Sequence, residues 1–349
     1  MTSVAELRRV VAFGVVLLAM ALQLSCSSEP AGPVELQGQT MGPGYSIKLY
    51  LPPGVVAAEL QAAVDARLEA VNDMMSTYRP ASDLMRFNHS TSTDWQPVPA
   101  PLAELVARSR EVSDQSGGRF DITVGPLVNL WGFGNLGPTN EAPADTVIAE
   151  VLQRVGYQRL DVRLDPPALR KQVAGLEIDL SAIAKGWGVD EVARLLESRG
   201  VSSYLVDIGG ELRSRGRKPD GASWHIAIER PLREGRAVQR VISLDDLAMA
   251  TSGDYRNYFR VGDDYYSHTL DPRSGRPVRH HLASVSVIAD DCASADAWAT
   301  ALLALGEQDG PALAERLGLK AFFIIRTTSG VEELASTAYA KFAAQEPAA

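Results

Sequence analysis

The sequence predicts an α+β fold: a single globular unit whose mixed or largely antiparallel sheet is flanked by helices. Three observations predict it. Helical periodicity prevails in the first half of the chain, strand-like stretches prevail in the second half, and the strict strand–helix alternation of a doubly wound parallel sheet is absent. Because no internal repeat or low-complexity tract follows the N-terminal region, we expect residues 35–349 to form one domain.

Three helices are expected in the first half. Residues 55–75 carry apolar side chains at helical spacing, namely Val56, Leu60, Val64, Leu68 and Val71. Pro101–Ser116 is the second helix, because proline suits a first helical turn and the glycine pair 117–118 ends it. Asp145 is expected to cap a third helix that runs to Tyr157.

The second half of the chain is predicted to be richer in strands. Leu176–Leu180 is predicted as a short strand, Gly186–Arg199 as a helix, and Ala293–Leu305 as a helix that ends at Gly306. Further strands are expected at Tyr204–Ile208, Trp224–Glu229, Val238–Leu244, Ala283–Ile288 and Ala321–Ile325. Strands that follow one another without a helix between them favour antiparallel pairing.

The composition excludes several classes of protein. Of the 349 residues, 46% are hydrophobic, which is enough for a sizeable core. The formal net charge of -9 argues against nucleic acid as a partner, but not against a phosphorylated small ligand, because one metal ion reverses the local field. With only Cys26 and Cys292, the chain holds neither a disulfide framework nor a multi-cysteine zinc site, and Cys292 is expected to be a core thiol.

Residues 1–25 have the form of a bacterial lipoprotein signal peptide. A basic stretch precedes the apolar run Val10–Leu22, which is shorter than the roughly 20 residues of a membrane-spanning helix. Cys26 follows and is expected to become the lipidated first residue, with residues 26–34 as a flexible tether. Gln23 departs from the usual leucine three residues before the cysteine, so ordinary secretion and a retained signal anchor remain as alternatives.

A glycine-rich segment, Gly38–Tyr50, is the first candidate for ligand contact. Its three glycines around Met41 permit close backbone approach, and an alternating strand follows. The alternative is a glycine-rich turn that leads into an edge strand.

A second candidate is Ser116–Gly134. Phe120 and Asp121 follow a glycine pair at a predicted helix end, and the apolar stretch that continues to Trp131 and Phe133 fits a pocket for a flat ring. The alternative is a buried loop in which Asp121 accepts backbone hydrogen bonds.

Two segments have the chemistry of a phosphate and metal site. Leu176–Asp190 leads from a strand through a turn with Lys185 into a helix, whose free amides and dipole favour phosphate. In Asp290–Gly306, Asp296 and Thr300 are four residues apart on a predicted helix and therefore share a face. A carboxylate and a hydroxyl in this arrangement suit a hard cation that also takes phosphate oxygens. Leu176–Asp190 is weak evidence by itself, and the alternative for Asp290–Gly306 is a capped helix with an ordinary contact between residues four apart.

The segment Ser267–Pro277 contains a candidate proton acceptor. His268 precedes Asp-Pro-Arg-Ser-Gly, which has the chemistry of a tight turn. A histidine beside a rigid turn is a candidate base, although a lone histidine is more often structural.

Taken together and in this order, the segments resemble the ApbE family, the FAD:protein FMN transferases. The residues that carry the resemblance are TMGPGYSIK, FDITVGPLVNLWGFG, IDLSAIAKGWGVD, HTLDPRSGRP and ADAWATAL, within roughly Leu36 to Gly318. The resemblance implies magnesium-dependent transfer of the FMN moiety of FAD to a Thr or Ser hydroxyl of an acceptor protein, with release of AMP. It also implies membrane redox complexes as partners, such as sodium-pumping NADH:quinone reductase, and a lipid-anchored position at the periplasmic side of the inner membrane.

The resemblance implies a role for individual residues. FAD would be held by Met41, Tyr78, Arg119, Phe120, Asp121, Asp179, Lys185 and Leu270. Magnesium would be bound by Asp296, the hydroxyl of Thr300 and the carbonyl of Ala182, and His268 would act as the base.

Two other functions remain open at this stage. A magnesium-dependent FAD pyrophosphatase would need the same residues, with water in place of the acceptor hydroxyl. A flavin-binding lipoprotein without chemistry would be expected to lack Asp296, Thr300 or His268, and all three are present.

Overall fold

The computed structural model describes residues 32–345, apart from residues 136, 138, 140, 233, 234, 256, 257, 262 and 263. The predicted signal peptide, Cys26 and most of the predicted tether lie outside the described residues. The chain divides into Met1–Pro33 and Val34–Ala349, and the elements below belong to the second unit. None of the described helices is long and apolar enough to cross a membrane.

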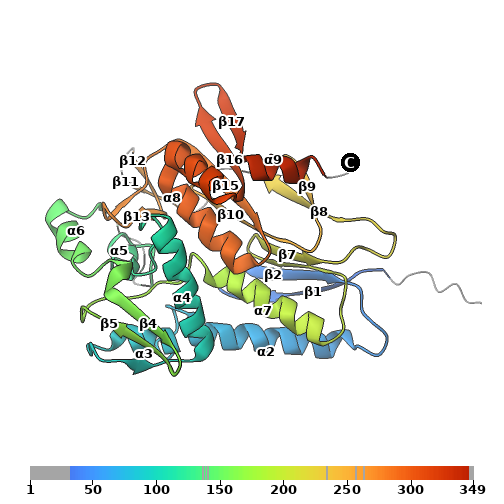
Figure 1. The fold of residues 1–349 in the computed structure, drawn as a ribbon, viewed down its shortest axis with the longest axis horizontal. Helices are drawn as coiled ribbons and strands as arrows, with labels where there is room; N and C mark the ends of the chain where they lie inside the picture. The colour runs from blue at the N-terminus through green and yellow to red at the C-terminus, as the bar shows by residue number, and fades with distance from the viewer. Residues whose placement is uncertain are drawn as a thin grey trace, which may run out of the picture. The chain divides into compact units, whose positions relative to one another are not determined.

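An eight-stranded antiparallel sheet forms the centre of this unit (Figure 1). Its strands, in spatial order, are β1 (Val34–Gln39), β2 (Gly44–Leu49), β6 (Tyr204–Ile208), β7 (Glu211–Arg215), β10 (Ala248–Gly253), β15 (Leu282–Ala289), β16 (Lys320–Thr327) and β17 (Gly330–Ala335). Neighbouring strands pair antiparallel throughout, which confirms the predicted α+β class. The pairing of β7 with β10 covers only two residue pairs, so the sheet opens between these strands.

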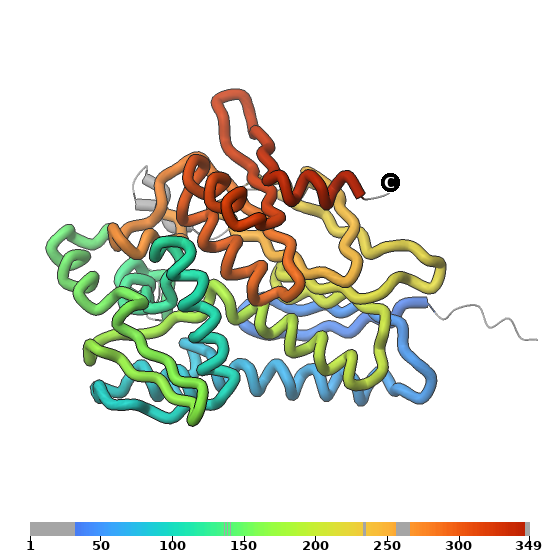
Figure 2. Tube along the Cα trace, viewed as in Figure 1, coloured from blue at the N-terminus to red at the C-terminus, as the bar shows by residue number. Residues whose placement is uncertain are grey.

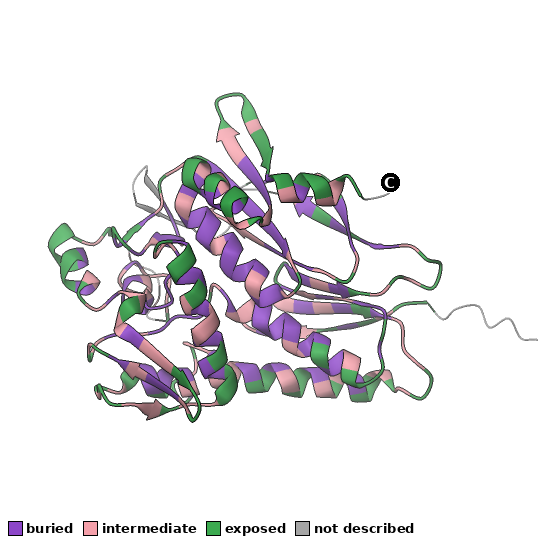
Figure 3. Cartoon of the chain, in the orientation of Figure 1, coloured by how far each residue is buried: buried purple, intermediate pink, exposed green. Residues whose placement is uncertain are grey.

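Three helices cover one face of the sheet (Figure 1). They are α2 (Ala57–Met75), α7 (Ala184–Ser198) and α8 (Cys292–Leu317). The apolar stripe predicted for α2 is buried from Leu60 to Val71, and each such side chain contributes roughly 1.5–3 kcal/mol of burial free energy. Figure 3 shows the contrast between α2, which is buried along one side, and the first part of α8, which is buried nearly all round.

Gly306 interrupts α8, as the sequence predicted, but the helix continues beyond it. The backbone at Gly306 has φ 81° and ψ −174°, and a second helical segment runs on to Leu317. A Cβ atom at this position would lie 2.9 Å from the ring of His280, so both the backbone and the packing require glycine.

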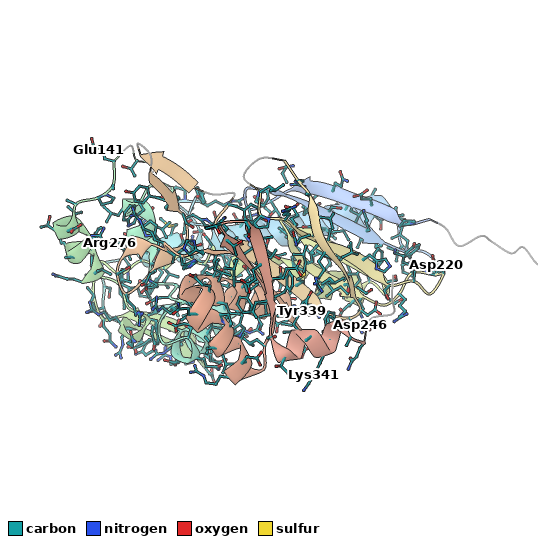
Figure 4. All side chains as sticks on the ribbon, turned by 90° about the horizontal axis from the view of Figure 1, so that it is seen from above. Glu141, Asp220, Asp246, Arg276, Tyr339 and Lys341 are labelled. Carbon is teal, nitrogen blue, oxygen red and sulfur yellow. The ribbon has the colours of Figure 1, made fainter. Side chains whose placement is uncertain are left out.

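The other face of the sheet carries β8 (Trp224–Glu229), β9 (Val238–Leu244) and α9 (Thr337–Ala343). Buried side chains of β8 and β9 form one core with those of β7, β10, β15 and β16. Tyr339 of α9, labelled in Figure 4, stacks on Phe322 of β16 with 5.2 Å between ring centroids. The sheet is therefore covered on both faces at this end.

A smaller group of elements packs beside the helical layer (Figure 2). It comprises α3 (Asp83–His89), β3 (Gln96–Pro97), α4 (Ala100–Gln115), α5 (Gly125–Leu130), α6 (Asp145–Leu152), the 3-10 turn Tyr157–Arg159, β4 (Leu160–Leu164) and β5 (Pro167–Lys171). Two short hairpins, β11 (Tyr258–Val261) with β12 (Asp264–Ser267) and β13 (Leu270–Asp271) with β14 (Arg276–Pro277), complete it.

The helix predicted from Asp145 to Tyr157 is shorter than expected. It ends at Leu152, before Gly156, whose φ of 135° is incompatible with a continuing helix. Asp145 is the first helical residue rather than the cap, and its carboxylate pairs with Arg276. The side chain therefore joins two segments far apart in sequence.

The predicted strand Leu176–Leu180 is wrong as a regular strand. It makes one isolated parallel bridge, between Glu177 and Val124. The amide and carbonyl of Ile178 instead bond the side chain of Asn88, each at 2.8 Å, and the Asp179 amide bonds the carbonyl of Ile122 at 2.7 Å. An extended, buried stretch satisfies its backbone without a ladder when a side chain takes the place of a neighbouring strand.

Lys171, beside this stretch, has a fully buried side chain. Its Nζ donates to the carbonyls of Asn88, Ser90 and Leu176 at 3.1, 2.9 and 3.0 Å, and burial lowers its pKa to about 8. Lys171→Met would leave two buried carbonyls and one partly buried carbonyl without this donor, so we expect a loss of about 2–4 kcal/mol in the free energy of unfolding. Urea denaturation measures the loss.

The neighbouring Arg170 supplies the control. It is half exposed and pairs with Asp161 at 2.8 Å, so Arg170→Met should cost no more than about 1 kcal/mol. Equal losses for the two variants would contradict the role given to Lys171.

Candidate functional site

One cleft brings together the residues singled out from the sequence. It has a volume of about 1640 Å³ and is bordered by segments from residue 37 to residue 300. Its lining includes Met41, Tyr78, Arg119, Phe120, Asp121, Asp179, Ala182, Lys185, His268, Leu270, Asp296 and Thr300, which is the complete predicted set.

The turn between β1 and β2 holds Met41 at the cleft. Met41 adopts a φ of 50° and is followed by Gly42 with a φ of 94°, which makes the turn tight. The Met41 side chain reaches Gly188 of α7, where an added Cβ would lie 2.9 Å from the methionine methyl carbon. The absence of a side chain at Gly188 therefore makes room for Met41.

The segment after α4 has a structural role as well as a place in the cleft. The Asp121 carboxylate accepts from the Thr123 amide and hydroxyl, both at 2.7 Å, and from the Tyr157 amide at 2.8 Å. Burial raises the pKa of Asp121, and these hydrogen bonds oppose the shift. The Asp121 carboxylate therefore holds a buried loop, as the alternative interpretation expected. The segment around it nevertheless borders the cleft.

Trp131 does not line the cleft, contrary to the prediction. It is 1% exposed, and its Nε1 donates to the carbonyl of Gly275 at 2.7 Å. Val124, Val128 and Phe133, from the same predicted apolar stretch, do line the cleft. The tryptophan anchors the predicted tight turn, in which the Gly275 amide bonds the Asp271 carbonyl at 2.9 Å.

The same turn positions Arg119. Its guanidinium donates to the carboxylate of Asp271 at 3.1 Å, and both side chains are largely buried. Burial raises the pKa of Asp271, and Arg119 opposes that shift. A cation whose place is fixed by a turn is available to an anionic or polar ligand in the cleft.

Tyr78 and Asp179 face the cleft from the smaller group of elements. Tyr78 is 66% exposed, which leaves its ring available for stacking. Its pKa is raised by desolvation of the hydroxyl and then by the negative charge of Asp179. Asp179 is fixed by the amide of Ser181, which donates to Oδ1 at 2.8 Å.

A cluster of three charged residues lies at the start of α7: Lys185, Glu211 and Asp296. Lys185 Nζ is 2.5 Å from Glu211 Oε1, and the Asp296 carboxylate accepts from the Gly186 amide at 3.0 Å. Burial alone lowers the pKa of Lys185, but the charges of Asp296 and Glu211 outweigh it, and the net shift is upward. We call these three residues the charged centre.

The carboxylates of the charged centre repel one another. Burial raises the pKa of Glu211 to about 7, Asp296 adds to the shift, and Lys185 opposes it. The pKa of Asp296 is also raised by burial. Two buried carboxylates beside one ammonium leave an excess of negative charge, which a cation would relieve.

Thr300 lies one turn after Asp296 on α8, as the sequence predicted. Its hydroxyl is 3.0 Å from that of Ser252, in the part of β10 that does not pair with β7. This contact fixes the Thr300 side chain. Ala182, half-buried in the turn before α7, also lines the cleft. The three predicted metal ligands therefore border one cleft.

His268 lies one residue after β12 and borders the same cleft. Its ring approaches that of Phe133 edge-on, with 6.4 Å between centroids. The Thr269 amide bonds the Ser267 hydroxyl at 3.1 Å, which fixes the backbone on either side of the histidine.

Comparison with known proteins places the chain in a family. The model of the ApbE family matches residues 41–323. This chain belongs to the ApbE family. The FAD:protein FMN transferase of Vibrio cholerae is 42% identical over 94% of this chain and 98% of its own length. The one from Escherichia coli K12 is 37% identical over 89% of each chain.

Solved ApbE structures have the same fold. The flavin transferase ApbE from Vibrio cholerae matches with a TM-score of 0.83 and 42% identity, covering 89% of this chain and 99% of that one. The apo form of Pseudomonas stutzeri flavinyl transferase ApbE matches with a TM-score of 0.82 and 41% identity, covering 90% and 98%.

The oxygen donors of this ApbE-family chain fit magnesium. In the described part of the chain, no three His, Cys, Asp or Glu side chains form a ready-made metal cluster. Magnesium usually takes only one or two protein carboxylates and completes its shell with water and substrate phosphates. Asp296, with the Thr300 hydroxyl and the Ala182 carbonyl, is a donor set of this kind, and the unrelieved negative charge of the charged centre favours a cation.

Sequence reasoning missed Glu211. The residue ends the run Asp207-Ile-Gly-Gly-Glu211, where a glycine pair turns β6 into β7. Its Oε2 is buried and finds no hydrogen-bond partner among the described residues. A carboxylate directly after a glycine turn was the available signal, but its pairing with Lys185 depends on the fold.

We expect Glu211→Gln to weaken magnesium binding in this ApbE-family site. The change keeps the shape of the side chain but removes one of the two negative charges of the charged centre. The dissociation constant for magnesium, measured by titration, should rise about tenfold to a hundredfold. Glu333→Gln, which breaks a surface pair with Arg240, should leave it unchanged. Similar values for both variants would rule out this role for Glu211.

Proposed function

We propose that this chain transfers the FMN moiety of FAD to a Thr or Ser hydroxyl of an acceptor protein and releases AMP, in the presence of magnesium. The observation that carries the proposal is the convergence of the complete residue set of the resemblance on one cleft. The shared name of the relatives, FAD:protein FMN transferase, supports flavin transfer to a protein.

The flavin half of FAD fits the part of the cleft between Tyr78 and the Phe133 wall. Aromatic and apolar side chains there offer contact to a flat ring system. Met41, Leu270 and the segment 119–121 border the same space, and the Arg119 guanidinium adds a fixed positive charge.

The pyrophosphate fits the charged centre. Lys185 provides a point charge, and it stands in the first turn of α7, where amides and the helix dipole favour phosphate oxygens. Asp296, Thr300 and the Ala182 carbonyl would hold magnesium. When bound, the ion supplies positive charge that offsets the charge of the pyrophosphate.

The proposed reaction is a single displacement at phosphorus, in which the residues of the cleft have separate roles. The acceptor hydroxyl oxygen attacks the phosphorus of the FMN half, and the bond from that phosphorus to the bridging oxygen breaks. The bridging oxygen leaves with AMP, and His268 takes the hydroxyl proton. The product carries FMN in a phosphoester bond to the acceptor side chain.

The proposed place of action is the periplasmic side of the inner membrane. Cys26, after the signal-like residues 1–25, would carry the lipid, and acceptor subunits of membrane redox complexes such as sodium-pumping NADH:quinone reductase would be the partners. A radioactive fatty acid supplied to cells should label the wild-type chain, and Cys26→Ala should abolish this labelling. Equal labelling of Cys26→Ala would contradict Cys26 as the site of lipidation.

Mass spectrometry of an acceptor tests the function. The purified chain is mixed with FAD, magnesium and an acceptor subunit of sodium-pumping NADH:quinone reductase. We expect the acceptor to gain the mass of one FMN, less water, and to lose this gain when magnesium is chelated. Free FMN and AMP without labelled acceptor would indicate an FAD pyrophosphatase. Intact FAD without turnover would indicate a binding protein.

A further inference from the structure

The cleft extends well beyond the residues assigned to FAD. Pockets for small molecules have typical volumes of about 300–1,000 Å³, and this cleft has about 1640 Å³. The additional part is bordered by β8 together with Gln37, Gln39, Ser46, Leu205 and Asp207. We call this part the β8 groove. Apart from Met41 at its margin, it contains none of the residues assigned to FAD or magnesium.

The wall of the β8 groove is a strand edge. All five consecutive residues of 225–229 line it, although successive side chains of a strand point to opposite faces. When every residue of a strand lines a cleft, the cleft runs along the edge of that strand and not along one of its faces. In the described residues, β8 pairs only with β9, so its other edge has no neighbouring strand.

The free edge of β8 faces the β1–β2–β6 end of the sheet. On the opposite side of the hairpin, β9 contacts the far end of the sheet, where Gln239 and Arg240 both bond Glu333 of β17 at 2.6 Å. Ser46 and Leu205, which are half-buried on the sheet, line the cleft here and form the floor of the groove.

The β8 groove leads to the charged centre. At its outer end, Trp224 lies against Tyr50, just after β2, with 6.2 Å between ring centroids. At its inner end, Glu229 pairs with Arg236 at 3.7 Å, and the charge of Arg236 acts on Asp207. Asp207 in turn accepts from the Gly210 amide at 2.8 Å, one residue before Glu211. From this end of β8 the lining of the cleft continues through Gly209, Gly210 and Glu211 to Lys185, so a chain that follows β8 ends in the same cleft as the charged centre.

We propose that the acceptor protein binds in the β8 groove as an extended segment that pairs with the free edge of β8. This inference rests on the proposed function, which requires a polypeptide hydroxyl at the charged centre. An extended segment satisfies unpaired strand amides and carbonyls through its own backbone, and it needs little of its sequence to be fixed. The Thr or Ser at its inner end is thereby delivered to the phosphorus.

Filling the floor of the groove tests the proposal. Ser46→Trp should raise the KM for the acceptor subunit by about tenfold or more, a factor worth 1.4 kcal/mol, while FAD affinity stays at the wild-type value. Lys48→Trp is the matched control, because Lys48 shares the strand and the face but lies outside the cleft lining. It should leave both quantities unchanged.

A second measurement uses the wild-type chain and so does not depend on how a variant folds. Short synthetic peptides centred on the acceptor Thr compete with the acceptor subunit, and each carries N-methyl groups at alternate residues. Because alternate amides of a strand point to the same side, one series should lose inhibition and the series shifted by one residue should keep it.

The possible outcomes distinguish a failure of the proposed acceptor site from a failure of the proposed transferase function. Wild-type transfer with normal acceptor KM in Ser46→Trp, or equal inhibition by both peptide series, would overturn the β8 groove and leave the transferase intact. A parallel loss of FAD affinity in Ser46→Trp would assign the groove to FAD and overturn the inference as well. Absence of FMN transfer by the wild-type chain would overturn the proposed function and the inference with it.

Discussion

Replacing Asp296 with alanine is expected to abolish magnesium-dependent FMN transfer. Asp296 is the only carboxylate in the proposed ligand set, and its side chain is 2% exposed at the wall of the cleft. Loss of this charge removes the main attraction for the cation where the pyrophosphate is split. We expect transfer to fall about a thousandfold or more, a loss of at least the size seen when one stabilising group of a transition state is removed.

The fold should survive this substitution. Burial raises the pKa of Asp296, so its ionised form is not favoured by the surrounding protein in the absence of a cation. Thermal unfolding and magnesium titration with FAD present are the two measurements. We expect Asp296→Ala to unfold cooperatively on heating and to bind no magnesium. A variant that fails to fold would show neither a cooperative unfolding transition nor magnesium binding.

Asp291 is the matched control on the same helix. It caps α8 by accepting from the Ser294 amide at 2.9 Å, and it pairs with Arg108 at 2.9 Å, outside the cleft. Asp291→Ala should cost about 1 kcal/mol of stability as a lost cap and leave transfer intact. Full transfer by Asp296→Ala would contradict the metal assignment, however the control behaves.

His268→Ala is expected to slow single-turnover transfer about 10²–10⁴-fold, which is the contribution usual for general base catalysis. His268 borders the same cleft as the charged centre, and the Thr269 amide, which bonds the Ser267 hydroxyl, fixes the backbone beside it. The affinity for FAD should stay within twofold or so, because the imidazole is assigned to the acceptor proton and not to the flavin.

A pH profile distinguishes a base from a merely structural histidine. The wild-type rate should fall on the acidic side as the base becomes protonated, and this limb should be lost in His268→Ala. His281→Ala, in an exposed residue away from the cleft, should retain the wild-type profile. If the pH profile of His268→Ala keeps its acidic limb, the base is another group.

The regular elements were largely predictable because their signals are local. The apolar period of α2, the strands β6, β8 and β9, and the interruption of α8 at Gly306 are all present near the expected bounds. Each depends on side-chain spacing or on a single glycine, which neighbouring residues decide.

The errors occurred at residues whose hydrogen-bond or ion-pair partners lie far away in the sequence. Ile178 bonds the side chain of Asn88, 90 positions away, and so does not need a strand neighbour. Asp145 is drawn to Arg276, and Trp131 to the carbonyl of Gly275. Each of these long-range contacts replaces the local role that the sequence pattern suggested.

The sequence by itself determined the α+β class, the candidate residues and, through five separated motifs, the resemblance to the ApbE family. It does so because periodicity, turn chemistry and motif order depend only on the order of residues in the chain. Only the tertiary structure placed Glu211 against Lys185, opened the sheet between β7 and β10, and, within the described part of the chain, left one edge of β8 without a paired strand. The physical reason is that charge pairing, burial and strand pairing depend on distances in space, which sequence separation does not fix.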